Sequence, residues 1–138
     1  REFPKILCKT LKKKKSFVFL SSVSNPKNFG VAKFNKKNKL IKIIEKPNSI
    51  ISNLAVTGLY IYNSSSIFHL KSIKRSKRGE LEISSLNNAL IKKNSLDYIN
   101  LGLGITWFDL GSFSNLYECS EFVKLQESRK GMQIAKII

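Results

Sequence analysis

Four short segments of the sequence place charged, aromatic or glycine residues at the ends of apolar runs of strand length. They are Phe29-Gly30-Val31, Glu45-Lys46-Pro47, Arg78-Gly79-Glu80-Leu81-Glu82 and Trp107-Phe108-Asp109-Leu110-Gly111. Open α/β sheets build their sites where strands end, so these segments are the candidates for a functional site. Asp109 is a residue type that holds Mg²⁺, because magnesium is bound by one or two carboxylates together with substrate phosphates.

Each segment also has a purely structural interpretation. Glu45 beside Lys46 is typical of a charge pair at a strand end. Asp109, which lies close before a glycine, can be a turn residue that accepts backbone hydrogen bonds. Glu80 and Glu82 suit the first turn of a helix, where carboxylates interact favourably with the helix dipole. No single segment therefore indicates a function.

Other residues argue against common kinds of catalytic or metal site. His69 is the sole histidine, and no motif supplies a serine or cysteine partner for a dyad or triad. Gly102-Leu103-Gly104 lies in a predicted hairpin without a following helix, so it does not predict a phosphate-binding loop. Cys8 and Cys119 lack the spacing of a C-x-x-C pair or a zinc site, and we expect both to be buried free thiols.

The pattern of apolar residues and turn residues predicts helices and strands that mix along the whole chain. The expected strands cover residues 16–20, 31–34, 40–44, 54–62, 96–101 and 105–108, with a hairpin loop at 35–38. The expected helices start near Pro4, at Ser66 and at Leu81, and a last helix is capped by Ser114 and stops at Gly131. We therefore predict an α/β fold, a mixed β-sheet with flanking helices, in a single domain over residues 1–138.

The composition is strongly basic: 25 Lys plus Arg against 9 Asp plus Glu give a net charge of +16. Clustered cations favour binding to the phosphate backbone of nucleic acids. The lysines are spread along the chain and only Lys12–Lys15 form a run, so we expect no nucleic-acid partner. The sequence shows neither a run of about 18 apolar residues nor a signal-peptide pattern. These features predict a cytoplasmic protein without a membrane partner.

Taken in order and spacing, the segments resemble the bacterial glucose-1-phosphate thymidylyltransferases of the sugar nucleotidyltransferase family. The resemblance runs from Asn25 to the carboxyl terminus and rests on Ile44–Pro47, Asn53–Tyr60, Arg78–Ile83 and Trp107–Gly111. Glu-Lys-Pro alone is shared by many sugar nucleotidyltransferases, whereas Ala-Val-Thr-Gly-Leu-Tyr and Arg-Gly-Glu-Leu-Glu-Ile together are specific. The resemblance implies a partial nucleotide-diphospho-sugar transferase fold, which is Rossmann-like.

The resemblance also implies a pocket for a sugar 1-phosphate. Gly30 and Glu45 would contact sugar hydroxyls, and Lys46 and Arg78 would be the catalytic cations that hold the sugar phosphate. Such cations suit phosphoryl transfer, in which the protein contributes mainly positioning and electrostatic stabilisation. The implied reaction converts dTTP and α-D-glucose 1-phosphate to dTDP-glucose and pyrophosphate, a step of nucleotide-sugar biosynthesis.

The remaining positions that match the family's motifs complete the implied site. Val56 and Gly58 would line the pocket with their backbone, and Trp107 would form a wall. Asp109 would bind the Mg²⁺ cofactor. For the full-length family the resemblance implies a homo-oligomer.

The family's amino-terminal nucleotide-binding half has no counterpart in this sequence. That half carries the glycine-rich nucleotide loop, the base-reading residues and a second metal-binding aspartate. We therefore expect a chain truncated before Arg1 and shortened after Ile138, without appreciable transferase activity by itself. Two alternatives stay open: a non-catalytic remnant that binds sugar phosphate or a partner chain, and, behind it, a basic nucleic-acid-binding domain.

Overall fold

The computed structural model describes residues 2–70, 73, 75, 79–131 and 133–134. The chain forms two compact units, Arg1–Ile105 and Thr106–Ile138. The expectation of a single domain over residues 1–138 stays a prediction. Within the described ranges, no helix is both long and apolar enough to cross a membrane.

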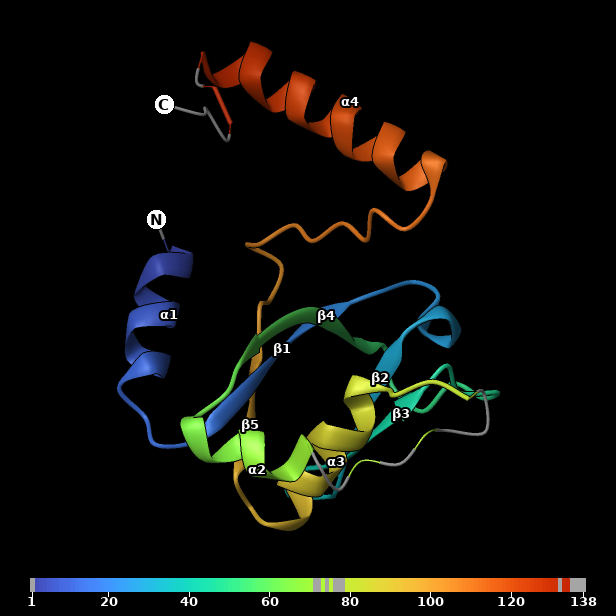
Figure 1. The fold of residues 1–138 in the computed structure, drawn as a ribbon. Coiled ribbons are helices and arrows are strands. Elements are labelled where there is room, and N and C mark those ends of the chain that lie inside the picture. The colour runs from blue at the N-terminus through green and yellow to red at the C-terminus, as the bar shows by residue number, and fades with distance from the viewer. Residues whose placement is uncertain (1, 71–72, 74, 76–78, 132, 135–138) are drawn as a thin grey trace. The chain divides into compact units, whose positions relative to one another are not determined.

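The first unit is built on one mixed sheet of five strands, which confirms the predicted α/β fold (Figure 1). The strands are β1 (Ser16–Ser22), β2 (Gly30–Phe34), β3 (Leu40–Glu45), β4 (Leu54–Ile61) and β5 (Leu96–Asn100). They lie in the order β3-β2-β4-β1-β5. β1 runs antiparallel to β4 and parallel to β5, and β2 runs antiparallel to both β3 and β4.

The helices of the first unit are short. They are α1 (Glu2–Leu11), α2 (Ile67–Leu70) and α3 (Ile83–Lys92), with two 3-10 turns, η1 (Pro26–Asn28) and η2 (Ser64–Ser66). Pro4 lies in the first turn of α1, where its missing N–H removes no helical hydrogen bond. The helices predicted near Pro4, Ser66 and Leu81 are thus confirmed.

The second unit contains the helix α4 (Phe113–Lys130). Its cap is Ser112, whose Oγ accepts a hydrogen bond from Asn115 N at 3.2 Å. The predicted cap at Ser114 is wrong, because this residue already lies inside the helix. Gly131 ends the helix as predicted, with a φ of +59°, a left-handed conformation that glycine adopts at little steric cost.

The strand predicted at residues 105–108 is wrong. β5 ends at Asn100, whose Oδ1 accepts a hydrogen bond from Gly102 N at 3.0 Å. In the part of the chain that the structure describes, no strand pairs with 105–108, and a β-prone run without a neighbour forms no ladder. The expected burial of both cysteines is also wrong, since Cys8 is exposed and Cys119 is only partly buried.

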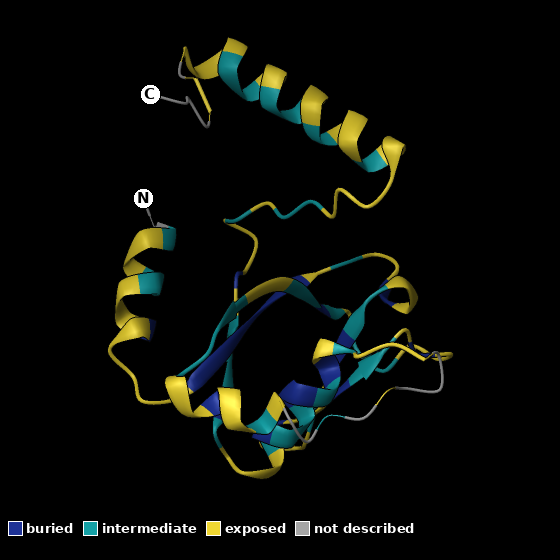
Figure 2. Ribbon diagram, in the orientation of Figure 1, coloured by how far each residue is buried: buried dark blue, intermediate teal, exposed yellow. Residues whose placement is uncertain are grey.

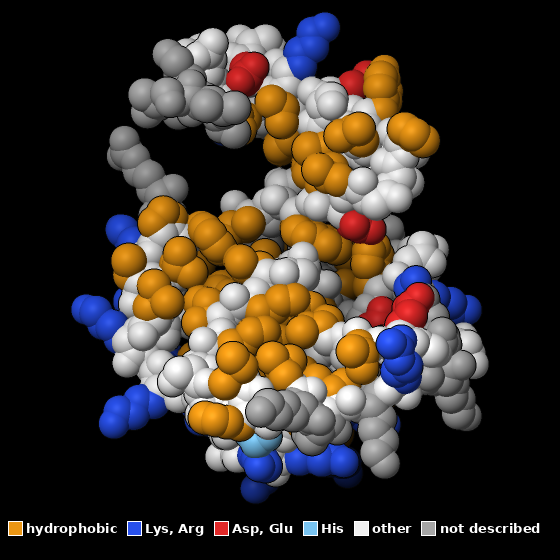
Figure 3. Space-filling view, viewed as in Figure 1, with side chains coloured by type: hydrophobic (Ala, Val, Ile, Leu, Met, Phe, Trp, Pro, Cys, Tyr) orange, Lys and Arg blue, Asp and Glu red, His pale blue; other side chains and the backbone are white. Residues whose placement is uncertain are grey.

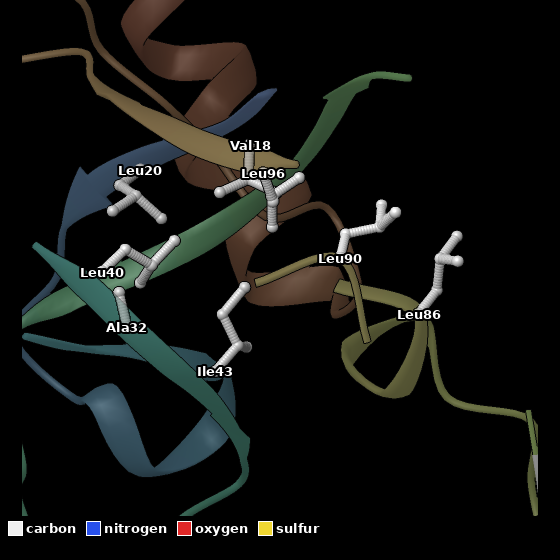
Figure 4. Close-up of a cluster of buried hydrophobic side chains, with 8 residues drawn as sticks. All are labelled: Val18, Leu20, Ala32, Leu40, Ile43, Leu86, Leu90 and Leu96. Atoms are coloured by element: carbon white, nitrogen blue, oxygen red, sulfur yellow. The ribbon is translucent and has the colours of Figure 1, made fainter. Parts of the chain in front are cut away.

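The hydrophobic core of the first unit lies between the sheet and α3 (Figures 2 and 4). α3 contributes Leu86 and Leu90, which are one helical turn apart and therefore lie on the same face. The sheet contributes Val18, Leu20, Ala32, Leu40, Ile43 and Leu96. This cluster holds α3 against the sheet and keeps the strands beneath it in place.

One polar side chain of α3 binds the edge of the sheet. Ile43 N donates to Oδ1 of Asn88 at 2.8 Å, and Nδ2 of Asn88 donates to Ile43 O at 2.7 Å. β3 is an edge strand, so these backbone groups have no strand beside them. The amide of Asn88 takes the place of a neighbouring strand at this point and fixes α3 to β3.

Candidate functional site

Three of the predicted site residues lie at one level across three adjacent strands. Gly30 on β2 is directly opposite Glu45 on β3. Val31 on β2 is opposite Ala55 on β4, and one residue further along the same antiparallel register sets Gly30 beside Val56. The sequence predicted these residues as parts of one pocket, and the sheet brings Glu45, Gly30 and Val56 together.

Glu45, Gly30 and Val56 form one row across the sheet, and the glycine in this row leaves room for the Glu45 carboxylate. A Cβ added to Gly30 would lie 3.0 Å from Glu45 Oε2 and 3.6 Å from Ile43 Cγ2. Any larger residue at position 30 would force the carboxylate to move, because 3.0 Å is at the limit of real contacts for a Cβ atom. Glu45 is itself partly buried. The row therefore presents a partly buried carboxylate next to Gly30, a position of β2 that carries no side chain.

Lys46 follows at the end of β3 in an unusual backbone conformation. Its φ is +41°, in the left-handed region that non-glycine residues seldom adopt. Lys46 N donates to Phe29 O at 3.0 Å, a bond that ties the residue after β3 to the residue before β2. The Lys46 side chain is exposed. Residues in sparsely populated backbone conformations cluster at active sites and ligand-binding segments, so this conformation is compatible with the predicted role of Lys46.

Gly58 lies at an irregular part of β4. Its φ is +81°, and the β1–β4 register shifts between Val18 and Leu20. Thr57 Oγ1 donates to Phe19 O at 3.0 Å and bridges the two strands at this shift. No described atom lies within 4 Å of a Cβ added to Gly58, so the backbone conformation, rather than crowding by the protein, requires the glycine.

A tyrosine on β4 that the sequence analysis did not select lies near the Glu45 carboxylate. Burial raises the pKa of Tyr60, and the negative charge of Glu45 raises it further. The Tyr60 ring stacks on Tyr62, with centroids 5.5 Å apart. Tyr62 in turn donates its hydroxyl proton to Asn87 Oδ1 at 2.6 Å. Tyr60 and Tyr62 alternate along the predicted strand, and this alternation was the signal that could have identified them as neighbours on one face of the sheet.

Replacing Glu45 with glutamine is expected to lower the pKa of Tyr60, because the tyrosinate form no longer meets a neighbouring negative charge. An NMR titration of the tyrosine ring carbons measures this, with the Tyr60 signal assigned from its absence in Tyr60→Phe. Glu118→Gln serves as control, since Glu118 is an exposed residue of α4 in the other unit. An unchanged Tyr60 pKa in Glu45→Gln would show that the two side chains are not neighbours.

The predicted cation Arg78 lies outside the described residues. The segment that follows it begins with Gly79, which has a φ of +78° and whose carbonyl accepts a hydrogen bond from Arg75 Nη1 at 2.6 Å. Glu82 is the N-cap residue of α3, which agrees with its structural interpretation at a helix start. The role of Arg78 stays a prediction.

Trp107 and Asp109 belong to the second unit. Trp107 is partly buried and Asp109 is exposed. A Cβ added to Gly111 would lie 3.4 Å from both carboxylate oxygens of Asp109, so this glycine leaves the carboxylate room. Asn115 Nδ2 donates to the Asp109 carbonyl at 2.7 Å and ties the segment to the start of α4.

Asp109 fits a magnesium ion only as one ligand among several. Within the described ranges, no group of three or more His, Cys, Asp or Glu residues could hold a metal ion. Its exposed carboxylate is nevertheless the hard oxygen donor that Mg²⁺ prefers. Water and phosphate oxygens of a substrate are the ligands that usually complete such a magnesium site.

The surface beside Asp109 has a different chemistry. Leu110, Gly111, Ser112, Phe113 and Leu116 line a shallow hollow of about 220 Å³. Phe113 is 93% exposed, and other apolar side chains of α4 are also exposed (Figure 3). The lining has no charged residue, so this hollow does not suit a phosphate.

A family model and the curated relatives of this chain agree on one family. A family model described as nucleotidyl transferase matches residues 2–126. A glucose-1-phosphate thymidylyltransferase of Neisseria meningitidis is 41% identical over 118 residues, which are 86% of this chain and 41% of that protein. The chain thus spans about two fifths of the length of the curated relatives it matches.

Solved structures share the fold. A Bacillus anthracis protein described as a glucose-1-phosphate thymidylyltransferase, in complex with sucrose, superimposes with a TM-score of 0.75 at 34% identity. The match covers 96% of this chain and 50% of that chain. An apo UDP-glucose pyrophosphorylase gives a TM-score of 0.77 over 89% of this chain and 47% of its own, at 22% identity, a likeness of fold alone.

Proposed function

The chain belongs to the nucleotidyl transferase family, and we propose that it forms the sugar 1-phosphate-binding part of a glucose-1-phosphate thymidylyltransferase. In the proposed reaction, a phosphate oxygen of α-D-glucose 1-phosphate attacks the α-phosphorus of dTTP. The bond from that phosphorus to the bridging oxygen breaks, and the electron pair leaves with pyrophosphate. The product is dTDP-glucose, and we place the reaction in the cytoplasm.

The observation that carries the proposal is the row of Glu45, Gly30 and Val56. A carboxylate accepts hydrogen bonds from sugar hydroxyls, and partial burial strengthens these bonds by limiting competition from water. Because Gly30 has no side chain, a sugar ring can approach the β2 backbone beside the Glu45 carboxylate. The row recognises the neutral part of the substrate.

Cations are proposed to hold the charged part of the substrate. Lys46 follows Glu45 directly, so a phosphate attached to a sugar on Glu45 lies within reach of a long, exposed lysine side chain. Arg78 supplies a second cation, in a planar geometry that can donate two parallel hydrogen bonds to phosphate. Together they would neutralise charge on the phosphoryl group as the new bond forms.

Two residues of the second unit keep in this proposal the roles that the resemblance implies, Trp107 as an apolar wall and Asp109 as a metal ligand. A bound Mg²⁺ would neutralise phosphate oxygens of the nucleotide. The protein's own contribution at this point is the Asp109 carboxylate, in the space that Gly111 leaves. A homo-oligomeric assembly also stays a proposal.

We expect the chain by itself to release no pyrophosphate from dTTP and glucose 1-phosphate in the presence of magnesium. Its 138 residues contain no glycine-rich nucleotide loop, and without one the α-phosphate is not oriented for attack. A coupled pyrophosphate assay measures this, with an active thymidylyltransferase as positive control. Release above a protein-free blank that disappears in Lys46→Ala would contradict the expectation.

A further inference from the structure

We infer that Asn87 and Asn88, adjacent residues of α3, are positioning residues for the row of Glu45, Gly30 and Val56. Each asparagine side chain is joined by hydrogen bonds to a different part of the sheet. Asn88 holds the strand that carries Glu45, and Asn87 holds an aromatic pair beside the Glu45 carboxylate. The inference rests on the proposed function, since it assigns these two residues to the proposed sugar site.

Asn88 acts on the position of β3. Its side-chain amide accepts a hydrogen bond from Ile43 N at 2.8 Å and donates one to Ile43 O at 2.7 Å. β2 holds one edge of β3, and this amide holds the other. Ile43 and Glu45 are two residues apart in one strand, so their side chains lie on the same face. A displacement of β3 at Ile43 would therefore move the Glu45 carboxylate relative to Gly30.

Asn87 acts on the tyrosines at the end of β4. It is fully buried, and its Oδ1 accepts a hydrogen bond from the Tyr62 hydroxyl at 2.6 Å. Burial raises the pKa of Tyr62, so this hydroxyl keeps its proton and remains a donor. The Tyr62 ring stacks on the Tyr60 ring with an interplanar angle of 13°. Burial, and then the charge of Glu45, raise the pKa of Tyr60, which places that tyrosine near the carboxylate. Asn87 thus fixes, through Tyr62, an aromatic neighbour of Glu45.

The surroundings of Asn87 argue that stability alone does not account for this residue. Its Nδ2 is buried and has no hydrogen-bond partner in the part of the chain that the structure describes. An unpaired N–H in the interior loses its hydrogen bonds to water and gains none in return. Leu86 and Leu90 of the same helix contribute apolar side chains to the core, and an apolar residue at position 87 would remove this penalty. A buried polar group kept under such a penalty can serve to fix one arrangement of its neighbours.

A double variant, Asn87→Leu with Tyr62→Phe, separates positioning from stability. It removes both polar partners and keeps their approximate shapes, so urea unfolding should give a stability close to or above that of the unmodified chain. We expect the pKa of Tyr60 to fall, because its ring is no longer held beside Glu45. We also expect glucose 1-phosphate to bind about threefold to tenfold more weakly. NMR titration of the tyrosine ring carbons and isothermal titration calorimetry measure the two effects.

Asn88→Ala tests the second contact, with Asn100→Ala as its matched control. Asn100 lies at the end of β5, the opposite edge strand, and its Oδ1 accepts a hydrogen bond from Gly102 N at 3.0 Å. Asn88→Ala should bind glucose 1-phosphate about threefold to tenfold more weakly and change the Tyr60 pKa, because the Glu45 carboxylate moves. Asn100→Ala should change neither. Leu96→Ala, a truncation of the core on β5, should lower the stability and also leave both quantities unchanged.

Unchanged binding or an unchanged Tyr60 pKa in either test variant would overturn the role of the asparagine that it replaces. Equally weakened binding in Leu96→Ala would assign the effect to lost stability and overturn the inference as a whole. A failure of the unmodified chain to bind glucose 1-phosphate would instead contradict the proposed function. The Tyr60 pKa is measured without ligand, so it would still decide whether the two asparagines hold Tyr60 and Glu45 beside each other.

Discussion

Replacing Leu90 with alanine is expected to lower the free energy of unfolding by about 2–5 kcal/mol. Leu90 is 1% exposed and joins α3 to the core of the sheet. Alanine removes the buried methyl groups and leaves a cavity that the strands can only partly fill, because they are fixed by their own ladder. Urea unfolding followed by circular dichroism measures the change as a lower midpoint at an unchanged slope.

The matched control for this variant is Leu103→Ala. Leu103 lies in the same unit and is 99% exposed, so its truncation removes almost no buried contact. We expect a change within about 0.5 kcal/mol. Equal destabilisation by the two variants would show that α3 does not pack on the sheet through Leu90.

The second large effect concerns the proposed ligand. Glu45→Gln should weaken the binding of glucose 1-phosphate about tenfold to a hundredfold, because hydrogen bonds to a charged acceptor contribute roughly 1.5–3 kcal/mol and a neutral amide cannot replace them. Isothermal titration calorimetry measures the dissociation constant. The exposed Glu118→Gln, in the other unit, should leave it unchanged.

A companion variant separates the position of the carboxylate from its charge. Gly30→Ala keeps Glu45 ionised but places a Cβ 3.0 Å from Oε2, so the carboxylate must move. We expect weaker binding of glucose 1-phosphate, with a stability close to that of the unmodified chain because the displaced group is the end of a flexible side chain. Unchanged binding in both Gly30→Ala and Glu45→Gln would exclude this row as the sugar site.

Local sequence patterns were sufficient to predict those elements whose structure depends on residues that are neighbours in the sequence. The strand at the start of β1, the β2–β3 hairpin and the helix stop at Gly131 were predicted because periodicity and turn residues act over short distances. The strand predicted at 105–108 failed because its formation depends on a partner strand that no local pattern supplies. Asn88 was missed for the same reason, since its contact with Ile43 joins residues that are distant in sequence.

The pairing register of the strands at the candidate site could be predicted only in part from the sequence. The predicted hairpin brings β2 and β3 together, and Phe34 is opposite Leu40. Continued without interruption, that register would pair Gly30 with Ile44 and move Glu45 out of the row. A shift between Lys33 and Phe34 pairs Gly30 with Glu45 instead. A slip of one residue reverses the face of each side chain, so this irregularity decides where the carboxylate lies.

The most direct test of the proposed sugar-phosphate site is an NMR titration of the isotope-labelled chain with glucose 1-phosphate. The proposal predicts saturable shift changes that are largest at the amides of Gly30, Glu45, Lys46 and Val56, and that are lost in Glu45→Gln. An absence of shifts at ligand in large excess over protein would contradict it. Shifts of equal size throughout the first unit, without saturation, would contradict it as well.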